Sequence, residues 1–219
     1  MTGFPGSPRL VKGGIVLVDP DSSAIQRVIT LQYNPDTLTR TLQVQGSGGD
    51  AGAHSEVLRL KGPPVETIKL DAELDAADQL EHPDDNPTTV QLGLHPQLAA
   101  LETMIYPTSQ SIQANKALAE SGVLEIIPSV APLTLFVWSR SRVVPVRITE
   151  LAITEDAFDP ALNPIRAKVS LGLRVLNVND LGYYGKAASI YLVHHQQKEQ
   201  MALRGLQGVI SQLGITGLP

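Results

Sequence analysis

The chain contains no cysteine and few aromatic residues. Without cysteine it has no disulfide bond and no thiolate metal site. Aromatic residues make up 4% of the 219 residues, so a groove that binds sugars or bases by stacking would be poorly supplied. The formal net charge of −5 argues against nucleic acid as the main partner, because that contact depends on Lys and Arg against phosphates.

Long apolar runs are also missing. No run approaches the roughly 20 residues that span a bilayer. Residues 1–8 lack the basic end and apolar stretch of a signal peptide. The sequence therefore predicts a soluble protein that is made in the cytoplasm and does not insert into a membrane. Hydrophobic residues make up 42% of the chain and charged residues 18%, which is enough apolar material for a folded core.

Alternating apolar and polar residues form the strongest pattern in the sequence. This period of two is typical of half-buried strands, and strands with a polar outer face favour an antiparallel sheet. Pro145 lies within one of these runs, where it predicts an edge strand or a bulge because proline has no backbone donor. The predicted strands span residues 14–18, 66–74, 133–138, 143–153 and 165–175.

A further alternating run, over residues 27–44, is interrupted by Tyr33-Asn34-Pro35. Proline ends the strand because it lacks a backbone donor and restricts the residue before it. The alternation resumes at Leu38. The run is interpreted as a strand, a YNP corner and a second strand.

Leucines at helical spacing predict a packed helix over residues 94–106, with Pro96 in its first turn. The preceding residues 78–88 read as a polar connection, and a weaker helical stretch covers residues 112–121. From residue 186 to about residue 213 the chain reads as a mostly polar helix that glycines interrupt.

These elements predict a flexible arm over residues 1–13, a β-domain over 14–177 and a C-terminal helical extension over 178–219. The predicted fold class is mainly β within α+β. It consists of an antiparallel β-barrel or β-sandwich with one packed α-helix and a C-terminal helical tail.

The order of these elements, with the YNP corner near the start, resembles the tube-type proteins of contractile injection systems, the phage-tail-like particles that drive a spiked tube into a target. Within this family it is most similar to the baseplate adaptor that forms the first tube ring above the spike. The segment 109–128 reads as an insertion, and no peptidoglycan-binding repeat follows Asn177, so a cell-wall-binding role is not carried over. The resemblance covers residues 14–176 and is carried by residues 31–38, 65–74, 98–101, 133–138 and 164–176.

The resemblance implies a tail-tube fold and a ring of six protomers in which each sheet continues its neighbour's. The ring would join the spike to the inner tube and nucleate tube assembly. Its expected partners are other copies of the chain, the spike or hub protein, the inner tube protein and other baseplate subunits, within a particle assembled in the cytoplasm. Alternatives are the main inner tube protein or a second tube-initiating ring and, from another class, a cell-wall-binding or hydrolytic β-domain.

The sequence offers no candidate catalytic, cofactor or metal residues, and we do not expect an enzyme. Asp71, Glu73, Asp75 and Asp78 form an acidic run, for which a solvated strand face is favoured over a hydrolase pair or a cation site. In a ring, such an acidic face would line the lumen and discourage cargo from sticking.

Two histidine-containing segments have residue types that can bind metal ions. Residues 81–86 contain oxygen ligands and a histidine without calcium-loop spacing, so an exposed turn is expected. His194 and His195 are adjacent on a predicted helix and point in different directions, so they are expected to be surface residues rather than joint metal ligands.

Candidate interface residues fall in three places: the YNP corner, the surroundings of Trp138 and the C-terminal segment. Trp138 is interpreted as a core or interface residue with arginines in a hairpin turn, and the alternative is a cation–π contact with a partner. The thin apolar stripe of the C-terminal segment fits either a self-packed helix or an arm that docks on a neighbouring ring. The candidates are Tyr33, Asn34, Pro35, Trp138, Arg140, Arg142, Ile190, Val193, Met201 and Leu206.

Overall fold

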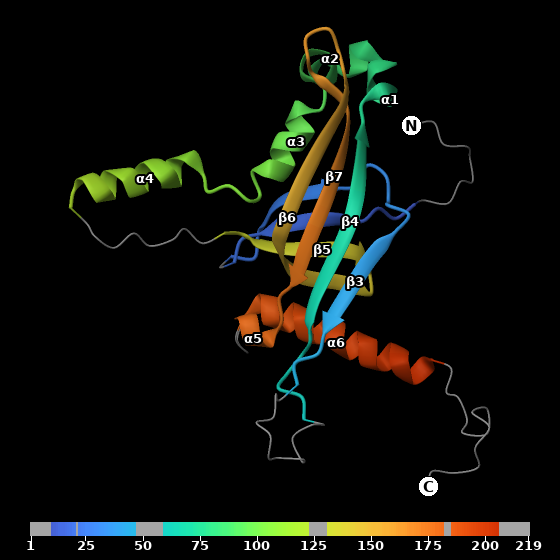
Figure 1. Cartoon of the computed structure of the whole chain (residues 1–219), viewed down its shortest axis with the longest axis vertical. Coiled ribbons are helices and arrows are strands. Elements are labelled where there is room, and N and C mark those ends of the chain that lie inside the picture. The colour runs from blue at the N-terminus through green and yellow to red at the C-terminus, as the bar shows by residue number, and fades with distance from the viewer. Residues whose placement is uncertain (1–9, 21, 47–58, 123–130, 182–184, 206–219) are drawn as a thin grey trace.

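The computed structural model describes residues 10–20, 22–46, 59–122, 131–181 and 185–205. Within these ranges the protein is mixed α+β, with strands dominant and one seven-stranded antiparallel sheet (Figure 1). Residues 1–9 of the predicted arm over 1–13, and the part of the predicted C-terminal helix beyond residue 205, lie outside the described residues.

The sheet runs in the order β2-β1-β5-β6-β7-β4-β3, and every neighbouring pair is antiparallel. The strands of the YNP run, β2 and β3, therefore lie at the two opposite edges and do not pair with each other. The described strands form one sheet. They do not form the two packed sheets of a sandwich, which was one of the two predicted arrangements. The strands are β1 (Gly14–Val18), β2 (Ile25–Thr30), β3 (Leu38–Gln43), β4 (Val65–Asp75), β5 (Leu133–Ser139), β6 (Arg142–Phe158) and β7 (Pro164–Val175).

The apolar sides of β4 and β7 form the centre of the core, as their alternating sequences predict. Ile68 on β4 and Leu173 on β7 are directly paired and both are fully buried. Phe136 from β5 and Ile15 from β1 extend the same core. Burying a side chain of this size contributes about 1.5–3 kcal/mol, so this alternation provides much of the driving force for folding.

Strand β6 is longer than predicted and occupies an interior position, so the prediction that Pro145 marks an edge strand is wrong. Leu176 N donates to Pro145 O at 2.9 Å, which shows that the backbone polar groups of Pro145 face the β7 side. Pairing between β6 and β7 begins only at Val146 and Val175. The missing N–H of Pro145 therefore falls just beyond the end of that ladder, where it leaves few bonds unmade.

Residues predicted as a polar connection form three short helices instead: α1 (Ala77–Leu80), η2 (Pro83–Asp85) and α2 (Pro87–Leu92). They bury little apolar surface, since Thr89 is the one residue that the three helices bury. Without a repeating apolar stripe, such helices give no periodic signal in the sequence.

The predicted packed helix is α3 (His95–Glu102), which buries Leu98 and Leu101 against the sheet. It ends earlier than predicted. Met104 rather than Ile105 then continues the buried side, and Ile105 is exposed.

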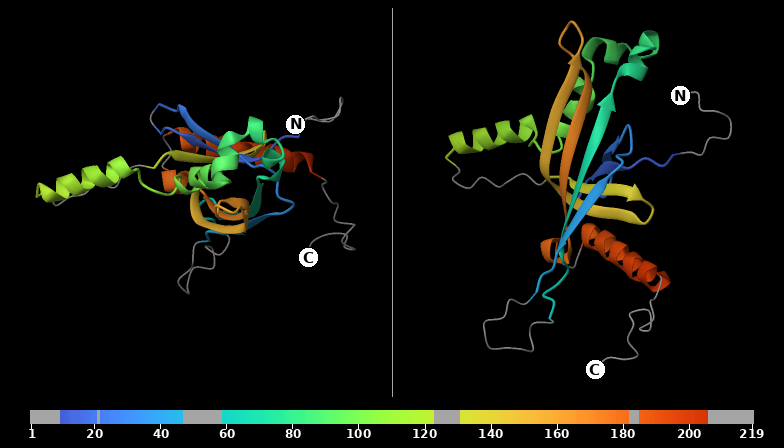
Figure 2. Two further views of the ribbon diagram at one scale, coloured as in Figure 1. Left: turned by 90° about the horizontal axis from the view of Figure 1, so that it is seen from above. Right: turned by 45° about the vertical axis from the view of Figure 1, so that its right-hand side comes forward.

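Three further helices complete the described chain: α4 (Ser109–Glu120), α5 (Val178–Leu181) and α6 (Lys186–Arg204). Helix α4 buries no residue, and Figure 2 shows it extending away from the sheet in both views. Helix α6 packs beside β6 and buries Ala188, Tyr191 and His194. The structure therefore has two packed helices, α3 and α6, whereas the sequence predicted a single packed helix.

Candidate functional site

Side-chain amides tie the segment around the YNP corner to the end of β4 and to the residues ahead of β1. Gln32 Nε2 donates to Asp75 O at 2.7 Å, and Gln32 Oε1 accepts from Asp75 N at 2.9 Å, which ties the corner to the end of β4. Asn34 Oδ1 accepts from Gly13 N, and Asn34 Nδ2 donates to Val11 O, which ties the corner to the residues ahead of β1. The Asn34 amide is therefore engaged within the chain, whereas Tyr33 is exposed as a large side chain at 46%.

Several stretches of strand have an unpaired side among the described residues. β2 and β3 end the sheet, and β6 is paired with β5 only over residues 142–146. Beyond Val146, β6 runs on to Phe158 with β7 on one side and no described strand on the other. Unpaired strand sides present rows of backbone donors and acceptors that can bind another strand.

The polar face of β4, β7 and β6 carries equal numbers of cationic and anionic side chains. Cross-strand ion pairs join several of them, at 3.1 Å between Lys168 and Asp71 and at 3.0 Å between Arg166 and Asp75. The expectation of an acidic face is therefore wrong, because neighbouring strands supply cations opposite the acidic run. The face comprises Lys69, Arg147, Arg166, Lys168 and Arg174 with Asp71, Glu73, Asp75, Glu150 and Asp156.

Two carboxylates of this face are held in their ionised form. The Ser170 hydroxyl and the Lys168 ammonium lower the pKa of Asp71. The backbone N–H of Ala77 is the main cause that lowers the pKa of Asp75, with Arg166 adding to it. A general acid needs a raised pKa, so this arrangement fits the solvated strand face that the sequence favours over a hydrolase pair.

The most buried carboxylate lies on the other side of β4. Glu66 accepts from Arg40 Nε on β3 at 2.6 Å and from Lys198 Nζ on α6 at 3.0 Å. Burial alone would raise the pKa of Glu66, but the two cations outweigh it and the pKa lies below the ordinary value. These three residues, named here the Glu66 clip, hold α6 against the β3–β4 pair.

His194 and His195 take different roles on α6. The prediction of two surface histidines is wrong for His194, which is buried and whose Nδ1 lies 3.1 Å from Ser141 O in the β5–β6 hairpin. Burial and the nearby Lys198 ammonium lower the pKa of His194. His195 is exposed, stacks on Tyr191 and lies 3.3 Å from Glu199.

Trp138 and its neighbouring arginines are part of the β5–β6 hairpin. Trp138 packs against Phe136, with ring centroids 5.8 Å apart, and is partly buried against the core. Arg140 lies in the turn and Arg142 begins β6, as the hairpin interpretation predicts. Of the C-terminal candidates, Ile190 is half-buried and Val193 and Met201 are exposed, whereas Leu206 lies outside the described residues.

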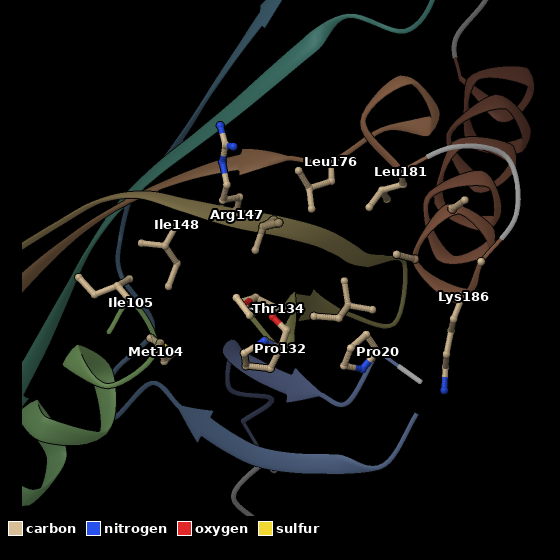
Figure 3. A pocket seen from close by; sticks show the side chains of 16 residues that line it. Pro20, Met104, Ile105, Pro132, Thr134, Arg147, Ile148, Leu176, Leu181 and Lys186 are labelled. Carbon is tan, nitrogen blue, oxygen red and sulfur yellow. Dashed lines mark hydrogen bonds between the residues drawn. The ribbon is translucent and has the colours of Figure 1, made fainter. Parts of the chain in front are cut away.

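A cavity of about 530 Å³ opens between the end of α3, the strands β5 and β6, and the start of α6 (Figure 3). Met104, Pro132 and Leu176 give it a mainly apolar lining. Figure 3 shows the side chain of Arg147 pointing away from this space, across β6, and the amine of Lys186 at the outer end. The cavity offers apolar surface with the Thr134 hydroxyl as a polar group.

Two tertiary contacts were not predicted from the sequence. They are the Glu66 clip, which joins α6 to β3 and β4, and the Gln32–Asp75 pair, which joins the YNP corner to β4. The sequence does carry one signal for the Glu66 clip. Glu66 falls in phase with Ile68 and Leu70, so it is an acidic residue at an apolar position of the alternation. No periodic signal marks Gln32, because its partners are backbone atoms of a distant strand.

A comparison of the chain with protein-family models and with curated proteins finds no match. Among the helices in the described ranges, none has both the length and the apolar character needed for a membrane crossing. Within the same ranges, no three His, Cys, Asp or Glu side chains are grouped so as to hold a metal ion.

Proposed function

We propose that this protein is a structural subunit of a contractile injection particle, forming a baseplate ring that joins the spike to the inner tube and starts tube assembly. The observation that carries the proposal is the antiparallel sheet with unpaired strand sides at β2, β3 and the outer part of β6. A second copy can satisfy these backbone groups by adding its own edge strand.

The two kinds of edge differ, which favours a ring over a symmetric dimer. β2 carries Arg27 as its charged residue, whereas the unpaired part of β6 carries Arg147 together with Glu150, Glu155 and Asp156. Unlike edges pair head-to-tail, and a head-to-tail contact around a rotation axis closes into a ring. The resemblance stated above suggests six copies.

The balanced polar face of β4, β7 and β6 supports a channel-lining role. Its side chains are hydrophilic, and cations and anions alternate at short range. Such a face has little net field with which to hold a charged cargo. In the proposed ring this face borders the lumen, while the apolar face stays in the core of each protomer.

The enzymatic alternative receives less support from the same residues. The acidic side chains of the sheet are ion-paired or exposed, and the pKa values of Asp71 and Asp75 are lowered rather than raised. A cell-wall hydrolase would need a carboxyl group that stays protonated near neutral pH.

The test is negative-stain microscopy of particles from the producing cell, with and without this gene. We expect the deletion to remove assembled tubes and to leave loose sheath or baseplate pieces. Intact spiked particles in the deletion strain would overturn the proposal.

Complementation sharpens this experiment. Val28→Asp places a charge on the exposed edge strand β2, and we expect it to fail to restore tubes. The matched control Leu118→Asp, on the projecting helix α4, should restore them if edge pairing is what matters. Thermal unfolding of both purified variants verifies that each is folded.

A further inference from the structure

The cavity of about 530 Å³ lies where two neighbouring strands separate. Thr134 and Val146 are the last paired residues of β5 and β6 at this end of their ladder. Beyond them, residues 131–133 at the start of β5 and residues 147–148 of β6 both line the cavity. The unpaired side of β6 therefore begins at this cavity.

Helix α4 is connected to the same cavity at both of its ends. The chain leaves the cavity at Met104 and Ile105, which lie together at one end of this space in Figure 3, and it returns to the cavity at Ala131. Between these points it forms α4, which extends away from the sheet in Figure 1. Three residues join Ile105 to Ser109, and ten residues separate Glu120 from Ala131.

These connections are long enough for α4 to lie along the cavity. A helix of 12 residues is about 18 Å long. Ten residues span up to about 33 Å when extended, so the returning chain can pass the whole length of the helix. The three residues before Ser109 reach about 10 Å, which brings the first turn of α4 to the cavity.

Helix α4 has one apolar side, and that side is exposed. Ile112 is 54% exposed and Leu118 is 45% exposed. Together with Ala119 they lie within about 120° of one another around the helix, whereas Ala117 lies on the opposite side. A helix of this length that packs on nothing is only marginally stable in water. The apolar side of α4 therefore gains stability from any apolar surface that covers it.

We propose that α4 folds back onto the cavity and inserts Ile112 and Leu118 among its apolar side chains, which gives the chain a closed form beside the extended one. Met104, Pro132 and Leu176 supply a mainly apolar lining that matches these two side chains. Both connections of α4 begin at residues that line the cavity, so the helix is present at high effective concentration. The occupant of the cavity is therefore the chain's own α4 rather than a separate partner.

The closed form has a consequence for assembly. Arg147 and Ile148 line the cavity and are the first residues of β6 beyond its ladder with β5. A helix seated there covers the start of the unpaired side of β6, and covering a strand with a helix protects it from unwanted pairing. In the extended form this side is open to a second copy. This consequence rests on the proposed function, whereas the closure itself does not.

Disulfide formation tests the closure directly, because the chain contains no cysteine. Leu118→Cys with Ile148→Cys places one thiol on the apolar side of α4 and the other in the cavity. After mild oxidation at low protein concentration we expect an intramolecular disulfide, seen as a faster-migrating monomer that reduction reverses. Ala117→Cys with Ile148→Cys is the matched control and should stay reduced. Equal oxidation of the two variants, or covalent dimers in place of the monomer, would overturn the proposal.

Hydrogen exchange measures the closure without a covalent bond. The amides of α4 should exchange about tenfold faster in Leu118→Asp than in the wild type, because a charge on the apolar side keeps the helix out of the cavity. Ala117→Asp lowers the helix propensity at least as much but lies on the other side, so it should change the exchange far less. Equal exchange of α4 in wild type and Leu118→Asp, or no disulfide from Leu118→Cys with Ile148→Cys, would overturn the proposal. Both measurements use the purified subunit, so their failure is distinct from the particle phenotype that tests the proposed function.

Discussion

Gln32 and Asp75 form a two-bond pair in which a side-chain amide takes the place of a neighbouring strand. Gln32 Nε2 donates to Asp75 O at 2.7 Å, and Gln32 Oε1 accepts from Asp75 N at 2.9 Å. Asp75 lies beyond the part of β4 that pairs with β3, which ends at Leu70. The amide therefore caps backbone groups that the edge strand does not reach.

Gln32→Ala should lower the free energy of unfolding by about 1–2 kcal/mol, because two backbone groups lose their partner. Urea denaturation measures the change as a lower midpoint with an unchanged slope. Gln43→Ala is the control, since Gln43 is exposed at the end of β3. Equal effects from the two substitutions would mean that the Gln32 pair adds nothing to stability.

Glu66→Gln should destabilise the protein by about 3 kcal/mol, because it leaves Arg40 and Lys198 beside a partner with no charge. Glu73→Gln, on the solvent face of the same strand, is the matched control and should change stability by less than about 0.5 kcal/mol. Hydrogen exchange should show faster opening of α6 in Glu66→Gln. Unchanged α6 protection would show that the clip does not hold the helix.

His194 predicts a loss of stability on mild acidification. Its folded pKa lies below the ordinary value of 6.5, because burial and the Lys198 charge disfavour the charged ring. The Ser141 carbonyl and Glu66 oppose this lowering, and Arg40 adds to it. The unfolded chain then binds a proton more readily than the folded one. The contribution of His194 is fully present above pH 6.5 and is lost as the pH falls from there through the folded pKa.

The measurement is the free energy of unfolding between neutral pH and the range where carboxylates begin to titrate. His194→Gln should flatten the decline in this window. Parallel curves for the wild type and the variant would exclude His194 as the source of the pH dependence.

Gly93→Ala should cost about 2 kcal/mol or more. Gly93 has a φ of 56°, and a Cβ there would lie 2.5 Å from Pro164 O, a backbone atom that cannot rotate away. Gly46→Ala is the control, since no atom of the described residues lies within 4 Å of a Cβ at that position. Thermal unfolding compares the two, and a similar small shift for both would contradict the close packing of α2 on β7.

The strands that were predicted well are those with one buried and one solvated face. In β4 and β7 the burial alternates as the sequence does, so the period of two identifies both strands and their inner sides. The far part of β6 was missed because both of its faces are largely exposed there, and Glu155 and Asp156 interrupt the alternation. Alternation reports a buried face, and it fails where a strand projects beyond the core.

The pairing of strands and the role of α6 were not readable from local patterns. Nothing near Tyr33 indicates that the strands on either side of it lie at opposite edges of the sheet. Two apolar residues, Ala188 and Tyr191, and the imidazole of His194 anchor α6, and they form no long apolar stripe. Both features depend on contacts between residues far apart in the chain, which only the assembled fold brings together.

The distance along the chain between β4 and β7 has a consequence for synthesis. Asp71 and Ser170, which face each other in the sheet, are 99 residues apart. While the ribosome makes the intervening residues, the apolar side of β4 has β3 as its neighbour and lacks the strand that completes its burial. Because such long-range pairing forms slowly and exposes apolar strands, the nascent chain should depend on chaperone protection until β7 has emerged.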